Sequence, residues 1–188
     1  MNGGIDELIS DATRRMDKSV ESTQVEFNTV RTGRASAALL DRISVDYYGQ
    51  KTPLQQLATI NVPEPRMLTV QPFDPSSVKA IEKSIQESDL GLTPSNDGKL
   101  IRLPIPQLTE ERRKEYVKIA RQYAEEGRVA VRNVRRDVIH GLKELVDNGE
   151  VGADDEHRAE DRAQKLTDEH VKSIDELVKH KEAEIMEV

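Results

Sequence analysis

Four arginines stand close together in RVAVRNVRRDV, which covers residues 128–138 of a chain of 188 residues. They are Arg128, Arg132, Arg135 and Arg136. The planar guanidinium group can donate two parallel hydrogen bonds to phosphate oxygens, so arginines at this density favour a polyanion as the partner. The whole chain carries a formal net charge of -7. Because exposed charges more than about 8 Å apart are largely screened at physiological salt, the local positive surplus matters more than the overall deficit.

These arginines belong to a longer basic segment with helical periodicity. Residues 112–136 contain nine Lys or Arg and three Glu. At about 100° per residue, most of these basic side chains fall on roughly a third of the helix circumference, beside the apolar stripe. We call this set the basic ridge, and its members are Lys114, Lys118, Arg121, Arg128, Arg132, Arg135 and Arg136.

The charge spacing of the ridge differs from that of an ordinary solvated helix. Among the four clustered arginines only Arg128 has an acidic neighbour at helical spacing, Glu125, and like-charged neighbours cost about 0.2 to 0.5 kcal/mol per pair. The segment after residue 153 instead places acids four residues before bases. The pairs expected there are Asp161 with Lys165, Asp168 with Lys172 and Asp175 with Lys179.

Two interpretations of the ridge remain open at this point. The favoured one is a surface for the phosphate backbone of folded RNA, since few aromatic residues are present to stack on bases. The alternative is that carboxylates of the same protein, or solvent alone, neutralise the charge. A helical adaptor for another protein would bind through the third helix or the β-rich region and would not need the arginines.

The other residue types predict no catalytic site, no metal site and no cofactor. The chain lacks cysteine, which excludes disulfides and thiolate chemistry. Its histidines (His140, His157, His170 and His180) have no zinc-ligand spacing, and the acidic run 154–161 lacks the ligand alternation of a calcium loop. No phosphate-binding loop or nucleophile elbow occurs, so we expect neither GTP binding nor hydrolase activity. No signal peptide or membrane span is expected, which favours the cytoplasm.

Three long amphipathic helices are expected to position the ridge. Apolar residues recur every three or four positions from Ile5 to Val30, from Val117 to Leu145, and from Ala163 to Ile185. Thr109 is the expected cap of the second helix, and Asn148-Gly149 is its expected end. Because a single amphipathic helix cannot bury its own apolar stripe, the three predict a helical bundle.

Residues 31–105 contain seven of the eight prolines and predict a different structure. Strands are expected at 43–48, 67–73 and 99–105, with a short helix from Asp74-Pro75 to near Gly91. We predict an α+β fold in which a small β/α/β domain, residues 31–105, is inserted into a three-helix bundle of residues 1–30 and 106–188. The chain crosses between the domains twice. The expected hinge residues are Thr32, Gly33, Pro104, Ile105 and Pro106, unless the domain interface is too tight to move.

Three motifs resemble the ribosome recycling factor family, in the family's order and over nearly the whole chain. They are RTGRAS at 31–36, DLGLTPSNDGKLIRLPIPQLTEERRKEYVK at 89–118 and VAVRNVRRD at 129–137. The resemblance implies an L-shaped monomer without enzymatic activity. It also implies binding to the post-termination ribosome, in the intersubunit space and against large-subunit ribosomal RNA. Together with elongation factor G and its GTP, such a protein separates the subunits and releases mRNA and deacylated tRNA.

The resemblance also assigns roles to particular residues. It implies that Arg132, Arg135 and Arg136 contact RNA, with Arg128 as a neighbour in the same surface. Arg31 and Arg34 lie in RTGRAS at the elbow, where they either contact RNA or brace the hinge. One departure is Ala37, where the family often has proline, and this leaves the stiffness of the hinge open.

Overall fold

The structure, a computed structural model, describes residues 3–187. Its long helices are α1 (Gly3–Asn28), α3 (Glu110–Asp147) and α4 (Ala153–Met186). The chain divides into two compact units: residues up to Val30 with those from Lys114 onward, and Arg31–Arg113 between them. The expected α+β class, a helical bundle with a small sheet-containing unit, is confirmed. No helix of the described residues is long and apolar enough to cross a membrane.

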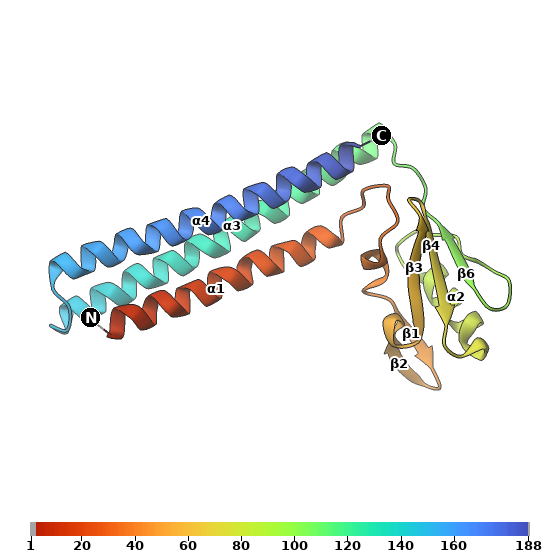
Figure 1. Cartoon of the computed structure of the whole chain (residues 1–188), viewed down its shortest axis with the longest axis horizontal. Helices are drawn as coiled ribbons and strands as arrows, with labels where there is room; N and C mark the ends of the chain where they lie inside the picture. Colours follow the sequence, from red (N-terminus) through yellow and green to blue (C-terminus); the bar gives the residue numbers. More distant parts are fainter. Residues whose placement is uncertain (1–2, 188) are drawn as a thin grey trace. The chain divides into compact units, whose positions relative to one another are not determined.

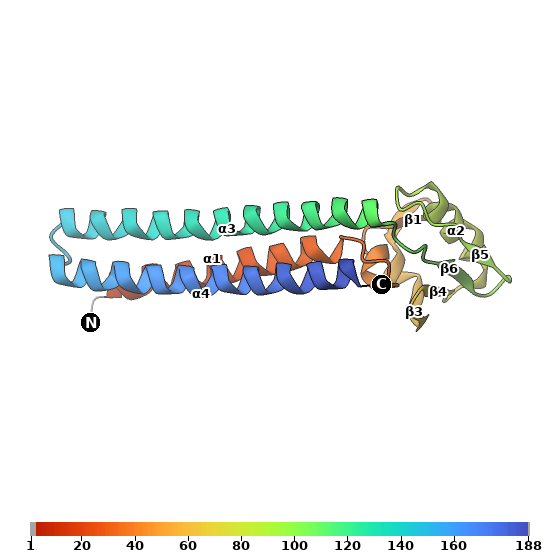
Figure 2. The same cartoon turned by 90° about the horizontal axis from the view of Figure 1, so that it is seen from above.

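The helical unit is a bundle in which α1, α3 and α4 lie side by side (Figures 1 and 2). The apolar stripe of each helix faces the other two, and the buried side chains form one continuous core. The apolar periodicity in the sequence therefore indicates the helices correctly, because each helix is stable only when the other two cover its apolar stripe. The largest fully buried side chains of this core are Met16, Phe27, Leu142, Ile174 and Ile185.

The ends of α3 follow the local signals in the sequence. The Thr109 hydroxyl oxygen accepts a hydrogen bond from the backbone amide of Arg112 at 3.1 Å, as the predicted cap requires. At the other end, Gly149 has φ +73°. Its amide donates to the carbonyl of Val146, and the next amide, that of Glu150, donates to the carbonyl of Leu145, both at 2.9 Å. These two bonds form a Schellman motif, which satisfies the last free carbonyls of the helix.

The three helices pack very closely around Gly127. A Cβ atom at this position would overlap the hydroxyl of Thr23 in α1 and would come within 3.1 Å of Ile174 Cδ1 in α4. Thr23 is itself buried, and its hydroxyl donates to the carbonyl of Ser19 at 2.8 Å. The missing side chain of Gly127 therefore allows α1 and α4 to approach α3 at the same level.

The second unit combines a hairpin, a four-stranded sheet and one helix. The hairpin is β1 (Ser44–Tyr47) with β2 (Gln50–Pro53), and the antiparallel sheet has the order β3-β4-β6-β5. The sheet strands are β3 (Ala58–Glu64), β4 (Met67–Pro72), β5 (Ser95–Asn96) and β6 (Ile101–Pro104). The α-helix is α2 (Val78–Glu87), and short 3₁₀ helices cover Ala37–Leu40, Leu54–Gln56 and Pro75–Ser77.

The core of this unit lies between the strands and α2. Its fully buried members include Leu40, Leu68, Ile81, Ile85 and Ile101. The three predicted strands are confirmed as β1, β4 and β6, and the predicted short helix is confirmed as α2. The structure adds β2, β3 and β5, which the sequence reasoning did not identify.

Candidate nucleic-acid interface

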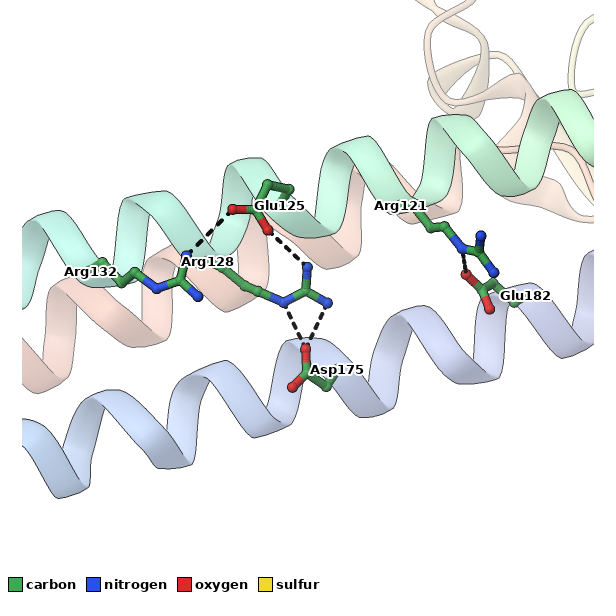
Figure 3. A network of polar contacts seen from close by, with 6 residues as sticks. All are labelled: Arg121, Glu125, Arg128, Arg132, Asp175 and Glu182. Carbon is green, nitrogen blue, oxygen red and sulfur yellow. Dashed lines mark hydrogen bonds and ion pairs between the residues drawn. The ribbon is translucent and has the colours of Figure 1, made fainter.

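Three arginines of the basic ridge reach from α3 to α4. Arg121, Arg128 and Arg135 are seven residues apart, which is close to two helical turns, so they lie in one line along α3. Arg121 Nε donates to Glu182 Oε1 at 2.5 Å, and Arg128 Nε donates to Asp175 Oδ1 at 2.7 Å. Arg135 Nη1 donates to the side-chain oxygen of Gln164, also at 2.5 Å. These contacts connect the two helices along their shared side, and Figure 3 shows the first two.

Arg128 is the most firmly held of the three. Its Nε and Nη2 both lie 2.7 Å from Asp175 Oδ1, its Nη1 lies 3.2 Å from Glu125 Oε2, and only 22% of its side chain is exposed. Burial alone lowers the pKa of Arg128, but hydrogen bonds and charge attraction from Asp175, and then from Glu125, outweigh it and raise the pKa. The hydrogen bond from Arg121 to Glu182 likewise raises the pKa of Arg121. Both arginines act as charged cross-links between α3 and α4.

Arg132 and Arg136 are more exposed. Arg132 Nη1 lies 3.4 Å from Glu125 Oε1, and 47% of its side chain is exposed. Arg136 is exposed and has no hydrogen bond or ion pair from its side chain within residues 3–187. Glu125 therefore lies between Arg128 and Arg132 and contacts both, as Figure 3 shows.

The four arginines between residues 128 and 136, here called the arginine group, keep a net positive charge after their internal ion pairs are counted. The four arginines Arg128, Arg132, Arg135 and Arg136 contribute +4, and the carboxylates bonded to them, Glu125 and Asp175, contribute -2, which leaves +2. The surplus lies toward Arg135 and Arg136, since Arg135 is bonded to a neutral amide. An exposed guanidinium without a carboxylate partner retains its donors for an incoming phosphate.

The alternative interpretation, that carboxylates of the same protein neutralise the ridge, applies to at least three of its members. Arg121, Arg128 and Arg132 are all paired with carboxylates of the same chain. The expected pairs within α4 are wrong, because none of them forms among the described residues. Asp175 is bonded to Arg128 instead, and Asp168 accepts a hydrogen bond from Gln164 at 2.8 Å. Spacing along a single helix does not predict these contacts, because the facing helix provides other partners for the same side chains.

The remaining members of the ridge lie near the start of α3. Lys114, Lys118 and Arg121 line a groove of about 500 Å³ together with Val117 of the same helix and Glu182 and Met186 of α4. The lining of the groove thus combines two apolar, three basic and one acidic residue.

The other predicted site residues belong to the sheet-containing unit. Arg31 is half-buried and Arg34 is exposed, and the Arg34 backbone amide donates to the hydroxyl of Thr32 at 3.4 Å. Gly33 has φ +78°, a conformation that favours glycine. Neither Thr32 nor Gly33 lies in a helix or strand.

The second connection has a more ordered beginning than the sequence suggested. Pro104 is the last residue of β6 and pairs with Met67. Ile105 is buried, and its amide donates to the carbonyl of Arg66 at 2.8 Å. Pro106 is exposed and lies outside any helix or strand. Two of the residues expected in this connection are therefore held by the sheet.

No group of three or more potential metal ligands occurs among residues 3–187. His170 bridges two helices instead. Its Nδ1 lies 2.7 Å from the carbonyl oxygen of Leu166 in α4, and its Nε2 lies 2.6 Å from Asp17 Oδ1 in α1. This histidine connects α4 to α1 on a different side of the bundle from the arginines that connect α3 to α4.

Comparison with known sequences gives one consistent family. The family model described as ribosome recycling factor matches residues 23–186. A ribosome-recycling factor of Rubrobacter xylanophilus is 57% identical over 180 residues, covering 96% of this chain and 97% of that protein. Another, from Geobacillus thermodenitrificans, is 54% identical over 182 residues and covers 97% of this chain and 98% of its own length.

Solved structures give the same result. A solution structure of a ribosome recycling factor matches all of this chain and all of its own, with a TM-score of 0.80 and 43% identity. A second match has a TM-score of 0.69 and 48% identity, and covers 97% of this chain and 99% of its own. It is the T. thermophilus ribosome recycling factor, placed with E. coli elongation factor G on the E. coli post-termination complex.

The bundle, its inserted sheet unit and these matches define a translation factor that is not an enzyme. More specifically, the chain belongs to the ribosome recycling factor family. The resemblance seen in its three sequence motifs is thereby confirmed.

Proposed function

We propose that this protein recycles ribosomes after termination. It binds the post-termination ribosome and, together with elongation factor G and GTP, promotes dissociation of the subunits and release of mRNA and deacylated tRNA. One observation carries the proposal: relatives named ribosome-recycling factor match nearly the whole chain at more than half of its positions. The T. thermophilus relative on the post-termination complex supports the same assembly, including elongation factor G. Such a role places the protein in the cytoplasm, as a monomer between the ribosomal subunits.

Three arginines of α3 are the proposed contact with large-subunit ribosomal RNA. Arg132, Arg135 and Arg136 donate to phosphates, and Arg128 supports them from its position between Glu125 and Asp175. The surplus of +2, obtained as four arginines minus the two bonded carboxylates, favours a polyanion. A row of arginines on a straight helix recognises backbone and shape rather than base sequence.

The connections between the two units are the proposed hinge. Thr32, Gly33 and Pro106 lie outside helices and strands, which leaves their backbone free of ladder hydrogen bonds. Arg31 and Arg34 flank the first connection and either contact RNA or stabilise the hinge. In this mechanism the helical unit holds the large subunit, and elongation factor G moves the other unit against the bridges between the subunits.

A subunit-splitting assay tests the function as a whole. Post-termination ribosomes that carry mRNA and deacylated tRNA are mixed with the full chain, elongation factor G and GTP, and light scattering follows their dissociation. We expect dissociation that requires all three additions. Dissociation that does not respond to the protein would refute the proposed function.

Binding to isolated large subunits tests the arginine contact. The variant Arg135→Ala/Arg136→Ala removes two charges from the proposed contact, and Arg14→Ala/Lys18→Ala removes two exposed charges from α1 as a matched control. Each lost phosphate contact should flatten the log–log salt slope by about 0.7 to 0.9, so the first variant should lose about 1.4 to 1.8. Equal slopes in the two variants would show that the contact lies elsewhere.

A further inference from the structure

Glu125 occupies an unusual position in the arginine group. Its carboxylate lies between two arginines of the same helix, with Oε2 3.2 Å from Arg128 Nη1 and Oε1 3.4 Å from Arg132 Nη1. The side chain of Glu125 is 58% exposed, so the carboxylate is accessible from solvent.

The two arginines depend on Glu125 to different degrees. Arg128 keeps two contacts of 2.7 Å with Asp175 whether or not Glu125 is present. For Arg132, Glu125 is the one carboxylate within ion-pair distance among the described residues. The Arg132 contact is also the longer of the two and the more exposed, and exposed pairs of this kind are worth at most about 1 kcal/mol. Glu125 is therefore a weakly held partner that a phosphate can replace.

We propose that Glu125 is an internal competitor of RNA, which occupies Arg132 in the free protein and must release it when a phosphate binds. The proposal deepens the ribosome-binding function argued above and rests on it. Glu125 is a positioning residue in this scheme, since it acts on RNA through Arg132. Its consequence is that the protein binds large-subunit RNA less tightly, and releases fewer counterions, than its arginines alone would allow.

The size of the effect follows from the charge balance. Neutralising Glu125 changes the surplus of the group from +2 to +3, as four arginines then face the single bonded carboxylate of Asp175. One additional phosphate contact steepens the log–log salt slope by about 0.7 to 0.9. If the variant and the unmodified protein bind equally at 1 M salt, this difference in slope makes the variant bind about five- to eightfold more tightly at 0.1 M salt.

The adjacent residue offers a matched control. Glu126 lies on the same helix, is also exposed and loses the same single charge on replacement by Gln. Its carboxylate accepts a hydrogen bond from Gln122 at 3.4 Å and has no ion pair with an arginine among the described residues. A general effect of net charge would appear equally in Glu125→Gln and Glu126→Gln, whereas release of Arg132 would appear only in the first.

The experiment measures binding of the full chain to isolated large subunits over a salt series. We expect Glu125→Gln to bind about five- to eightfold more tightly at 0.1 M salt with a steeper slope, and Glu126→Gln to stay close to the unmodified protein. In the Arg132→Ala background, the gain from Glu125→Gln should disappear, because the released group is then absent. A structural role alone would not produce this dependence on Arg132.

The outcomes separate this proposal from the proposed function. Equal effects of Glu125→Gln and Glu126→Gln, weaker binding by Glu125→Gln, or a gain that persists without Arg132 would each overturn the competitor role. In all of these cases the proposed function still stands if the unmodified protein binds in a manner that depends on Arg135 and Arg136. If the unmodified protein does not bind large subunits, it is the proposed function that fails.

Discussion

Replacing Gly127 by Ala tests how closely the three helices pack. Two effects oppose each other at this buried position in α3. Alanine favours the helix over glycine by about 1 kcal/mol. The added methyl group, however, overlaps the Thr23 hydroxyl and comes within 3.3 Å of Thr23 Cβ and 3.1 Å of Ile174 Cδ1. Threonine is β-branched and cannot easily turn away, so overpacking of about 1 to 3 kcal/mol should dominate.

We therefore expect Gly127→Ala to lower the free energy of unfolding by up to about 2 kcal/mol. A double-mutant cycle with Thr23→Ala identifies the cause, because that change removes the hydroxyl that the new methyl group overlaps. In the Thr23→Ala background, Gly127→Ala should become neutral or stabilising by up to about 1 kcal/mol. Urea unfolding followed by far-ultraviolet circular dichroism measures all four proteins, since the long helices dominate that signal.

Gly141 provides the matched control on the same helix. A Cβ atom there would meet the Leu8 side chain, at 2.9 Å from Cδ2 and 3.2 Å from Cδ1. These are the flexible ends of a half-buried leucine, which can move aside. Gly141→Ala should therefore be neutral or stabilising by about 0.5 to 1 kcal/mol. If Gly127→Ala stabilises the protein as much as Gly141→Ala does, the close approach of the helices at Gly127 is refuted.

Two further predictions concern a turn and a carboxylate. Gly149→Ala should destabilise the protein by about 1 kcal/mol in the same urea unfolding experiment, because φ is +73° at Gly149. Hydrogen bonds from the Ser76 side chain and amide, and then from the Tyr47 hydroxyl, lower the pKa of Asp74. A lowered folded-state pKa contributes stability above the unfolded value of about 3.9, and this stability is lost as pH falls through the folded pKa. Asp74→Asn should therefore weaken the dependence of stability on pH below about 4, and an unchanged dependence would contradict this assignment.

The helical unit was predictable because its signals are local and repeated. Each long helix has an apolar stripe, and α3 has its cap at Thr109 and its stop at Gly149. The strands were predicted less completely. Strand β3 is largely exposed, contains Pro63 and lies at the edge of the sheet, so neither alternation nor a continuous apolar run marks it in the sequence.

The ion pairs of the arginine group could not be predicted from spacing along α3 alone and became visible in the structure. Along α3, Arg128 and Arg132 seemed to lack carboxylates other than Glu125, because Asp175 is far away in the sequence. One signal was nevertheless present. Arg121 and Arg128 are seven residues apart on α3, and Asp175 and Glu182 are seven apart on α4. Matching heptad spacings on two antiparallel helices indicate bridges between them, and the pairs Arg128–Asp175 and Arg121–Glu182 follow that order.

The order of the helices along the chain has a consequence for synthesis of the protein. The partners that cover α1 lie beyond the sheet-containing unit, and α4 continues to Met186. During translation α1 therefore leaves the exit tunnel with its apolar stripe uncovered. The stripe stays uncovered while more than a hundred later residues are added. We expect the middle of the nascent polypeptide to fold first, with the bundle assembling only near chain completion. Until then, the stripe from Ile5 to Phe27 is a natural target for chaperones that shield hydrophobic segments.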